Sequence, residues 1–453
     1  MTQHVTVAII GTGFGGQAAA IRLKRLGITD FVMLERRPFM GGTWLQNTYP
    51  GAAVDVPSPL YSLAGEPWDW SQMYADQAEL AAYTEAVIER HGLRAHARLE
   101  TTVTGLVWQA DAGHWRVETD RGAWTAQFVI NASGPLSKPV IPEFPGRDTF
   151  AGPAFHTNHW DHGVDLRGKR VAVIGSGASA AQVIPALVDQ VAELHVFQRT
   201  PHWVMPRADR VFTPRERAAL RRAPARAALR AGIYWKLESR VLGLKYSKTL
   251  LKVFAEREAL AHLAAQVPDE ALRAKLTPDY AIGCKRVILS NTLLPALAHP
   301  NTTLHDRLDG VARIHPGGIL TAGGRDVALD VLAYATGFDA TDDAISYGVT
   351  GEGGRTLAAS WAEFPRAYLG TAVPGFPNLF IVTGPNTGIG HTSALFIIES
   401  QMNYIMACLQ AVRAAGARSV AVKAEAEAAY TARIHREMRR TVWQAGGCRS
   451  WYQ

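Results

Sequence analysis

Cysteine is scarce in this chain of 453 residues, which holds only Cys284, Cys408 and Cys448. The three lie far apart in the sequence, and none belongs to the close spacings of a zinc site or a redox-active pair. We therefore expect no metal centre and no chemistry carried by a cysteine pair.

Long apolar runs are also missing. No uninterrupted stretch approaches the ~20 apolar residues that a membrane span needs, although 47% of the residues are hydrophobic. The segment Met1–Thr6 lacks the basic and apolar order of a secretion signal. The length predicts two or three domains. The sequence thus predicts a soluble cytoplasmic protein without a membrane span.

Acidic residues are rare in residues 207–252, which hold 13 Lys or Arg against 3 Asp or Glu and so carry +10. The whole chain carries +7, so the remainder carries −3. No docking motif accompanies these charges, and we expect no nucleic-acid partner. The composition predicts a mostly helical insertion with a solvated basic face. A weak association with anionic membrane surfaces is a less favoured extension.

Two glycine-rich segments each follow an apolar run. In the first, Val5–Ile10 leads into Gly11-x-Gly13-x-x-Gly16, a helical pattern, and an apolar strand, Phe31–Leu34, that ends at Glu35. This is the order of a dinucleotide-binding βαβ unit, in which the glycines make the turn and admit the pyrophosphate. Glu35 lies where a carboxylate accepts hydrogen bonds from the adenosine ribose. We predict that this site binds FAD.

The second segment repeats the plan. Arg170–Ile174 leads into Gly175-Ser-Gly177-Ala-Ser179-Ala180, where alanine is an accepted third residue, and a helix is expected from Ala181. At the position that corresponds to Glu35 stand Arg199 and Thr200. A cation and a hydroxyl suit the 2′-phosphate of NADPH, which a carboxylate would repel. We predict NADPH at this second site.

The stretch between the two units carries a more specific pattern. Phe150, Gly152, His156, Trp160 and Asp161 stand at the spacing F-x-G-x-x-x-H-x-x-x-W-[P/D]. This resembles the fingerprint of type I Baeyer–Villiger monooxygenases, flavoproteins that insert oxygen beside a ketone carbonyl. The resemblance implies that His156 lies in the connection between the flavin and nicotinamide domains. A hinge role and a satisfied buried histidine are both compatible with that place.

Residues 41–55, GGTWLQNTYPGAAVD, are similar to a second fingerprint of the same family. The resemblance implies that Gly42, Thr43 and Trp44 lie along the flavin and that Asp55 ends beside the active site. Tyr61 corresponds to a tyrosine that packs near the flavin. For Trp44, plain core packing is an equal alternative to stacking on the ring.

Three further segments complete the resemblance. Residues 283–289, GCKRVIL, look like the segment in which a lysine binds the NADPH phosphate and an arginine reaches the flavin, here Lys285 and Arg286. Asn386 lies in a loop expected to face the isoalloxazine ring. Trp451 matches a tryptophan that contacts the nicotinamide nucleotide.

The resemblance also implies the domain order. Two Rossmann-like α/β domains are expected, the NADPH domain inserted in the FAD domain, because residues 327–337 and 379–386 resemble strands that return the chain to the flavin domain. The expected parts are an FAD-binding part, 1–145; a linker with the first NADPH-binding part, 146–206; a helical insertion, 207–278; the second NADPH-binding part, 279–326; and the second FAD-binding part with a C-terminal loop, 327–453.

The implied activity is the conversion of ketones to esters or lactones with NADPH and O2, through a C4a-peroxyflavin. Arg286 would stabilise the anionic species as a permanent cation, and Asp55 would orient its guanidinium. The main alternative is a flavin monooxygenase that oxygenates nitrogen or sulfur. A pyridine nucleotide–disulfide reductase needs a close cysteine pair at the flavin, and the positions of the three cysteines exclude it. A non-enzymatic flavoprotein and the oligomeric state stay open.

Overall fold

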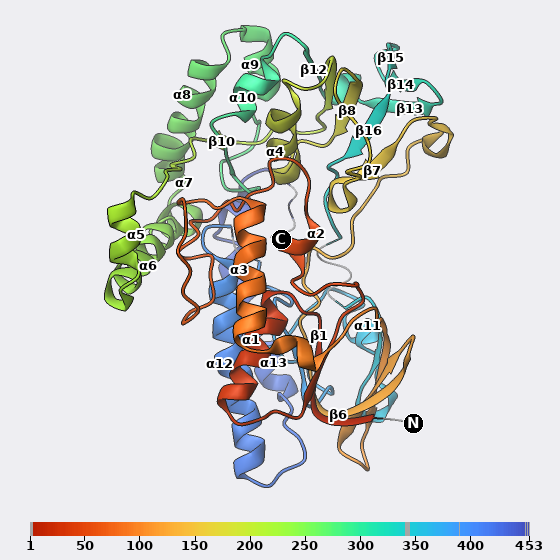
Figure 1. Ribbon diagram of the computed structural model, residues 1–453, viewed down its shortest axis with the longest axis vertical. Helices are drawn as coiled ribbons and strands as arrows, with labels where there is room; N and C mark the ends of the chain where they lie inside the picture. Colours follow the sequence, from red (N-terminus) through yellow and green to blue (C-terminus); the bar gives the residue numbers. More distant parts are fainter. Residues whose placement is uncertain (1–2, 340–344, 389, 449, 451, 453) are drawn as a thin grey trace.

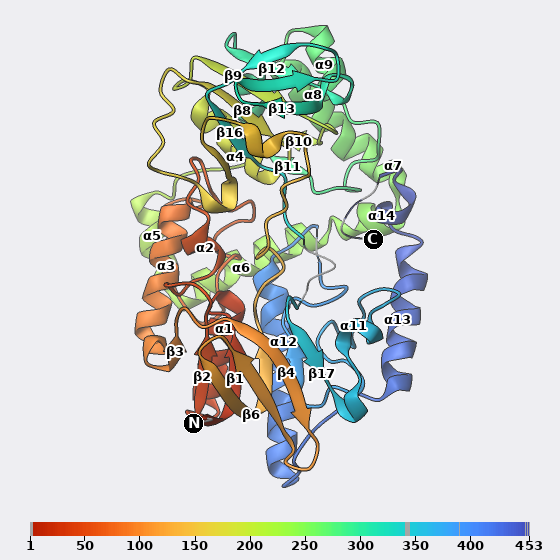
Figure 2. The ribbon, with the colours of Figure 1, turned by 90° about the vertical axis from the view of Figure 1, so that its right-hand side faces the viewer.

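The computed structural model describes residues 3–339, 345–388, 390–448, 450 and 452. Two sheets occupy two lobes stacked along the long axis. Four helices run along the left side of Figure 1: α5 (Pro214–Leu220), α6 (Ala223–Glu238), α7 (Lys248–Leu250) and α8 (Arg257–Gln266). The view turned by 90° shows the same two lobes, with α6 crossing the region between them (Figure 2). The site described below lies where the two lobes meet.

The first sheet is built on three parallel strands whose central residues are fully buried. β1 (Gln3–Ile10) runs between β2 (Phe31–Leu34) and β6 (Gly122–Asn131), and Ile10 lies opposite Leu34 and Asn131. The carboxyl ends of these strands therefore meet at one edge, directly before Gly11. Further strands complete the sheet: β3 (Ala97–Arg98), β4 (Val103–Gln109), β5 (His114–Thr119), β17 (Gly348–Thr350) and β18 (Leu379–Ile381).

Helices cover this lobe because each presents an apolar stripe to the sheet. α1 (Phe14–Arg25) packs against α12 (Ala394–Ala414) and shares one hydrophobic core with it. The other helices of this part of the chain are α2 (Thr43–Gln46), α3 (Gln77–Arg90), α11 (Leu357–Ser360), α13 (Ala424–Met438) and α14 (Val442–Ala445).

The second sheet is wholly parallel, as a sheet buried on both faces should be. Its strand order is β12 (Thr302–His305), β9 (Glu193–Phe197), β8 (Arg170–Ile174), β16 (Val331–Tyr334) and β7 (Ala154–His156). α4 (Ala178–Leu187) and α10 (Leu293–Leu297) pack on it. A small antiparallel sheet flanks this lobe, formed by β13 (Val311–His315), β14 (Gly318–Thr321) and β15 (Asp326–Ala328).

The expected domain boundary at residues 326/327 is wrong in its position. β16 pairs with β8 and β7, so residues 331–334 belong to the second sheet. Within the apolar stretch 327–337, residues 331–334 form an inner strand of the second sheet, and residues 327 and 328 belong to β15 of the small antiparallel sheet. The chain returns to the first sheet only after Tyr334, and β17 is the next strand that pairs there.

The insertion at residues 207–278, which contains the basic segment, is mostly helical in the structure. It contains α5 (Pro214–Leu220), α6 (Ala223–Glu238), α7 (Lys248–Leu250), α8 (Arg257–Gln266) and α9 (Glu270–Leu276), with wider π-type turns at Leu242–Tyr246 and Leu251–Glu256. Leu237 of α6 lies in the core of the first lobe, and Leu263 of α8 lies in the core of the second. These helices therefore bridge the lobes.

One helix among the described residues, α12, is long and apolar enough to cross a membrane by length and composition. Its apolar face packs in the protein core: Leu395, Met402, Ile405 and Leu409 are buried in the cluster that includes α1. This is the setting of a core helix.

Candidate active site

The first glycine loop follows β1 and opens α1. A Cβ on Gly16 would lie 2.1 Å from the carbonyl oxygen of Gly11, so only glycine lets the helix approach the strand this closely. Gly13 caps α1 without any side-chain acceptor for the first helical N–H groups. A Cβ on Gly42 would lie 2.7 Å from Cα of Gly13, so two glycine backbones meet there. The loop is a cradle suited to a pyrophosphate.

Glu35 lies at the end of β2 with its carboxylate oriented by this loop. It is 7% exposed and accepts hydrogen bonds from the backbone N–H (3.0 Å) and hydroxyl (2.7 Å) of Thr12 and from the backbone N–H of Arg37 (3.1 Å). A carboxylate has about four acceptor positions. One acceptor position of Glu35 remains for a ribose hydroxyl, so this carboxylate fits the adenosine half of FAD.

The second glycine loop repeats this geometry after β8. Gly175 has φ +124°, and a Cβ there would lie 2.2 Å from the carbonyl oxygen of Ala335. Gly177 caps α4 without a side-chain acceptor, and Ser179 lies in the first turn of that helix. Thr200 is held at the loop because its carbonyl accepts a hydrogen bond of 3.0 Å from Ser176. These residues fit a second pyrophosphate.

Two cations from distant parts of the chain meet beside this second loop. Burial lowers the pKa of Lys285, and the nearby Arg199 guanidinium lowers it further. Lys285 lies 5.1 Å from the ring centroid of Tyr280, and Arg199 is exposed. Two neighbouring positive charges are stabilised by an anion placed between them. A 2′-phosphate supplies such an anion, which fits NADPH.

Arg286 and Asp55 form an ion pair between the lobes. The guanidinium donates a hydrogen bond of 2.7 Å from Nε to a carboxylate oxygen of Asp55, 231 residues earlier in the chain, and Nη2 lies 2.6 Å from the same oxygen. Asp55 raises the pKa of Arg286 above its already high ordinary value. Both side chains keep about a third of their surface exposed, at 35% and 33%. The pair is thus permanently charged and still accessible.

A cavity of about 300 Å³ lies against this pair. Its walls come from α4, from the loop of residues 51–55 and from residues 286–292, and they include Gln182, His202 and Arg207. The loop is fixed on α4 because Tyr49 donates a hydrogen bond of 2.9 Å to Gln182, which donates one of 2.8 Å to the carbonyl of Ala53. The ion pair therefore faces a cavity shared by both lobes.

The predicted flavin-side aromatic residues lie together. Trp44 is 8% exposed and donates a hydrogen bond of 3.2 Å to the hydroxyl of Tyr61, with the rings edge to face at 5.8 Å. Burial raises the pKa of Tyr61 to about 12, so its hydroxyl stays protonated. Thr43 begins α2 and is exposed. Asn386 is exposed with φ +61°, and Trp451 lies outside the described residues.

Comparison with known proteins agrees with this geometry. A family model described as pyridine nucleotide-disulphide oxidoreductase matches residues 8–231. A Baeyer–Villiger monooxygenase of Streptomyces coelicolor is 45% identical over 99% of this chain and 87% of its own length. One from Pseudomonas aeruginosa is 42% identical over 99% of this chain and 85% of its own. The chain belongs to the Baeyer–Villiger monooxygenases.

Solved structures of the family superpose closely on this one. A steroid monooxygenase bound to NADP has a TM-score of 0.90 at 31% identity, covering 100% of this chain and 94% of that one. An open structure of cyclohexanone monooxygenase has a TM-score of 0.85 at 30% identity, covering 98% and 96%. The predicted fold class, two Rossmann-like domains, is confirmed.

Residues near both ends of the Baeyer–Villiger fingerprint make close packing contacts. A Cβ on Gly152 would lie 2.3 Å from the carbonyl of Asp330, and Trp160 packs edge to face on Phe155 at 4.9 Å. His156 is 3% exposed, and burial lowers its pKa to about 4, so it is neutral. Neighbouring Asn158 donates a hydrogen bond of 2.9 Å to Asn47. The two fingerprints thus contact each other across the lobes.

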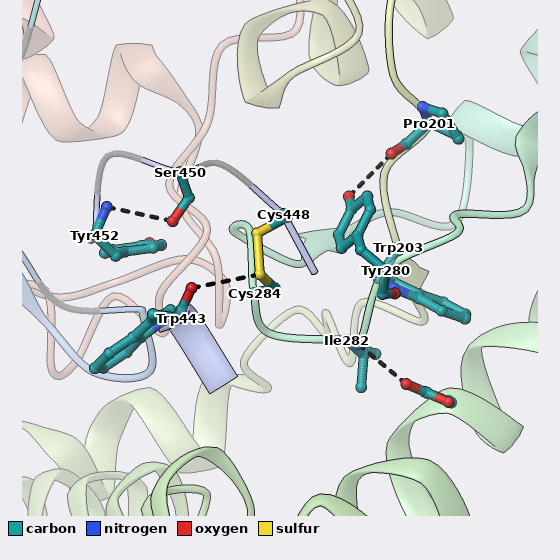
Figure 3. The surroundings of a disulfide bond; sticks show 10 residues. Pro201, Trp203, Tyr280, Ile282, Cys284, Trp443, Cys448, Ser450 and Tyr452 are labelled. Atoms are coloured by element: carbon teal, nitrogen blue, oxygen red, sulfur yellow. Dashed lines mark hydrogen bonds between the residues drawn. A yellow bond between two sulfur atoms is a disulfide. The ribbon is translucent and has the colours of Figure 1, made fainter. Parts of the chain in front are cut away.

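The distant cysteine positions gave no sign of a disulfide, yet two of the three cysteines pair. Cys284 and Cys448 form a disulfide although 164 residues separate them (Figure 3). The chain folds back at its C-terminal end, which no local spacing could reveal. The disulfide-reductase alternative therefore fails on the family relationship, because its exclusion on cysteine positions no longer holds. Among the described residues, no cluster of potential metal ligands occurs.

His202 is a cavity residue that sequence reasoning missed. Burial lowers its pKa to about 4, and the Lys285 charge lowers it as well. It precedes β10 (Val204–Met205), which pairs with β11 (Ile288–Leu289), two residues after Arg286. The histidine thus stays neutral beside two cations. Only its place directly after Arg199, Thr200 and Pro201 hinted at a site role.

Proposed function

We propose that this chain binds FAD at the first glycine loop and NADPH at the second and uses O2 to convert ketones into esters or lactones. The observation that carries the proposal is the Arg286–Asp55 pair, which faces a cavity lined by α4, by residues 51 and 55 and by residues 286–292. A related structure, titled OTEMO complex with FAD and NADP, has a TM-score of 0.88 at 28% identity over 97% of this chain. FAD and NADPH are the cofactors proposed for this chain.

The two cofactors, when bound, supply the hydride and the activation of O2. The first loop with Glu35 would hold the FAD pyrophosphate and ribose, and Gly42, Trp44, Tyr61 and Asn386 would line the flavin. The second loop would hold NADPH, with Ser179 and Thr200 near the nucleotide and Arg199 and Lys285 at the 2′-phosphate. Each of these residue roles is part of the proposal.

Arg286 would act on the substrate as a fixed positive charge. As oxygen adds to a ketone, negative charge grows on the carbonyl oxygen, and a preorganised guanidinium stabilises that charge. Arginine does not release a proton at working pH, so it provides charge without acting as an acid. Asp55 orients the guanidinium through one hydrogen bond from Nε and the ion pair with Nη2. The neutral His202 adds no competing charge to the cavity.

A product test separates this function from oxygenation of nitrogen or sulfur. Purified protein with FAD, NADPH and O2 is incubated with a panel of ketones and, separately, with thioethers and amines, and products are identified by mass spectrometry. Ester or lactone formation in step with NADPH consumption supports the proposal. Sulfoxide or N-oxide formation with no ester from any ketone contradicts it.

We also propose a cytoplasmic location and a weak association with anionic membrane surfaces. Trp235 and Phe254 on the helical insertion are 69% and 68% exposed, and Leu242 and Tyr246 are 58% and 65% exposed. The exposed Lys236, Arg240 and Lys252 lie in the same segment. Aromatic and basic side chains together suit the interface of an anionic bilayer.

A further inference from the structure

A second arginine lines the cavity beside the Arg286–Asp55 pair. Arg207 stands two residues after β10 and is the first residue of the basic segment 207–252. Its side chain lines the same cavity of about 300 Å³ as Arg286. The reaction proposed above uses Arg286 as the cation at the ketone and gives Arg207 no part. The few polar groups of a ligand cavity commonly fix the orientation of the ligand, so Arg207 is a candidate for substrate recognition.

Arg207 is fixed from two sides. β10 and β11 pair in parallel, and two residues beyond these strands Arg207 meets Asn291. The backbone N–H of Arg207 donates a hydrogen bond of 2.9 Å to Oδ1 of Asn291, and its carbonyl accepts one of 2.8 Å from Nδ2. The side chain is held by Tyr74, a core residue of the first lobe: Nη2 donates 3.1 Å to the Tyr74 carbonyl, and the guanidinium lies 4.9 Å from the ring centroid. The cation is therefore preorganised, which lowers the entropic cost of binding a ligand.

The guanidinium of Arg207 is only partly satisfied. A guanidinium carries five N–H donors on three nitrogens. Among the described residues, only Nη2 has partners, which are the Tyr74 carbonyl and the carboxylate of Asp209 at 3.3 Å. Nε is buried without a hydrogen-bond partner, and the side chain as a whole keeps 19% of its surface exposed. Nη1 is thus the nitrogen left for an acceptor that enters the cavity.

The cavity carries one unbalanced positive charge. Among the described residues, four that line it can be charged: Asp55, His202, Arg207 and Arg286. Asp55 and Arg286 balance each other as an ion pair, and burial lowers the pKa of His202 to about 4, so the histidine is neutral. The partner of Arg207, Asp209, is not part of the cavity wall. Arg207 therefore presents its charge to the cavity, while the charge of Arg286 is already matched there.

We propose that Arg207 binds a carboxylate of the substrate, so that the ketones this chain favours are those that carry a carboxylate group. This inference rests on the proposed oxygenase function. The carbonyl would lie at Arg286 and the carboxylate at Arg207, with the carbon skeleton against residues 287–289 and the small apolar residues of α4. Guanidinium and carboxylate form charge-assisted hydrogen bonds. The basic segment that begins at Arg207 carries +10, and its field attracts anionic substrates toward the site.

The test uses ketones of two lengths, 4-oxocyclohexanecarboxylate and 4-oxocyclohexaneacetate, each compared with its own methyl ester. The kcat/KM for lactone formation by the holoenzyme is measured at neutral pH for both members of each pair. Calorimetry measures the binding of the same compounds to the oxidised holoenzyme without NADPH. Because the ketone is the same within a pair, the ratio of the two values reports the carboxylate alone. For the length that fits, we expect wild type to favour the carboxylate by about tenfold, mainly through KM, as one charge-assisted hydrogen bond would give.

Arg207→Met removes the charge but keeps an unbranched side chain over Tyr74, and it should lose the preference for the carboxylate. Arg207→Lys keeps the charge without the planar fork and should retain part of the preference. Arg210→Met is the matched control, because it makes the same charge change in the same segment. Arg210 is 47% exposed on its side chain, pairs with Glu216 and does not line the cavity. Its ratio should match that of wild type.

Two results would overturn the proposal. One is an unchanged ratio in Arg207→Met, whatever happens to its KM for NADPH. The other is a wild type that favours neither carboxylate over its methyl ester, in turnover or in calorimetry, and this result needs no variant to fold. Carboxylate-selective binding that Arg207→Met loses, with no lactone from any ketone, would keep Arg207 as the anion site and reject the oxygenase function alone.

Discussion

Arg286 donates a hydrogen bond from Nε to one oxygen of Asp55, and its Nη2 lies 2.6 Å from that same oxygen. In the part of the chain that the structure describes, no group donates a hydrogen bond to the other oxygen of this carboxylate. The guanidinium also lines the cavity and keeps about a third of its surface exposed, at 35%. This leaves a permanent cation with donors free for a substrate oxygen.

Replacing Arg286 by alanine should separate flavin reduction from oxygen insertion. Loss of one preorganised charge contact commonly costs about 10²–10³ in rate. We expect Arg286→Ala to bind FAD and to be reduced by NADPH, perceptibly more slowly, yet to form almost no ester. Stopped-flow absorbance measures reduction, and product analysis measures insertion. Arg286→Lys, which keeps the charge but not the planar fork, should be intermediate. Near-normal ester formation by Arg286→Ala would remove the arginine from the mechanism.

Asp55→Ala should show a milder defect than Arg286→Ala. The guanidinium stays charged but loses its orienting partner, so we expect a loss of about tenfold to 10²-fold in ester formation. The KM for NADPH should change little, because Arg199 and Lys285 lie elsewhere. Steady-state kinetics with one ketone measure both constants. A loss as large as that of Arg286→Ala would show that the pair acts as one unit.

Arg199→Ala should weaken the preference for NADPH over NADH. A charge-assisted contact contributes about 1.5–3 kcal/mol, or roughly 10- to 150-fold in preference. Lys285→Ala should have a similar effect, because the two cations lie together. The KM values for NADPH and NADH are measured for each variant. An equal rise in both KM values would show that neither residue reads the 2′-phosphate.

Acid should destabilise the fold through its buried histidines. Burial lowers the pKa of His156, His202 and His305 to about 4 in the folded protein, against about 6.5 in an unfolded chain. The unfolded chain therefore binds more protons between these values, and the free energy of unfolding falls as pH drops from about 6.5 to about 4. Thermal melts at pH 7 and pH 5 measure the loss. His156→Asn should lose less between these pH values than wild type, and an equal loss would contradict this cause.

The exposed aromatic residues of the helical insertion should mediate any binding to lipid. Trp235→Ser with Phe254→Ser should reduce cosedimentation with vesicles of phosphatidylglycerol and phosphatidylcholine. Vesicles of phosphatidylcholine alone should bind little, and raised salt should weaken binding because the charges are exposed. Leu308→Ser is the matched control, since Leu308 is 78% exposed outside the insertion. Equal binding by the double variant and the control would reject a surface built on these aromatic residues.

The sequence predicted correctly those strands whose ends are set by neighbouring residues. Phe31–Leu34 and Arg170–Ile174 were expected as strands and are strands with these bounds, because each is a short apolar run ended by a turn or an acid. The helix expected from Ala181 begins at Ala178, since the backbone of Gly177 caps it. Residues 331–334 were placed in the wrong sheet, because an apolar strand does not indicate which neighbours it pairs with.

In the candidate site too, short motifs predicted some of the contacts and missed others. The Arg286–Asp55 contact followed from two motifs, each readable over a few residues. The Cys284–Cys448 disulfide joins residues that are 164 positions apart, and no local spacing encodes the path of the chain that brings them together. His202 has an ordinary sequence setting, and its low pKa comes from burial and the Lys285 charge.

The central claim is that this chain inserts one atom of O2 into a ketone. The direct measurement is a single incubation of the holoenzyme with NADPH, a cyclic ketone and ¹⁸O2, followed by mass spectrometry of the product. The account predicts a lactone that carries one ¹⁸O atom, formed by wild type and nearly absent with Arg286→Ala. NADPH oxidation that yields hydrogen peroxide and unchanged ketone, for every ketone that fits the cavity, would contradict it.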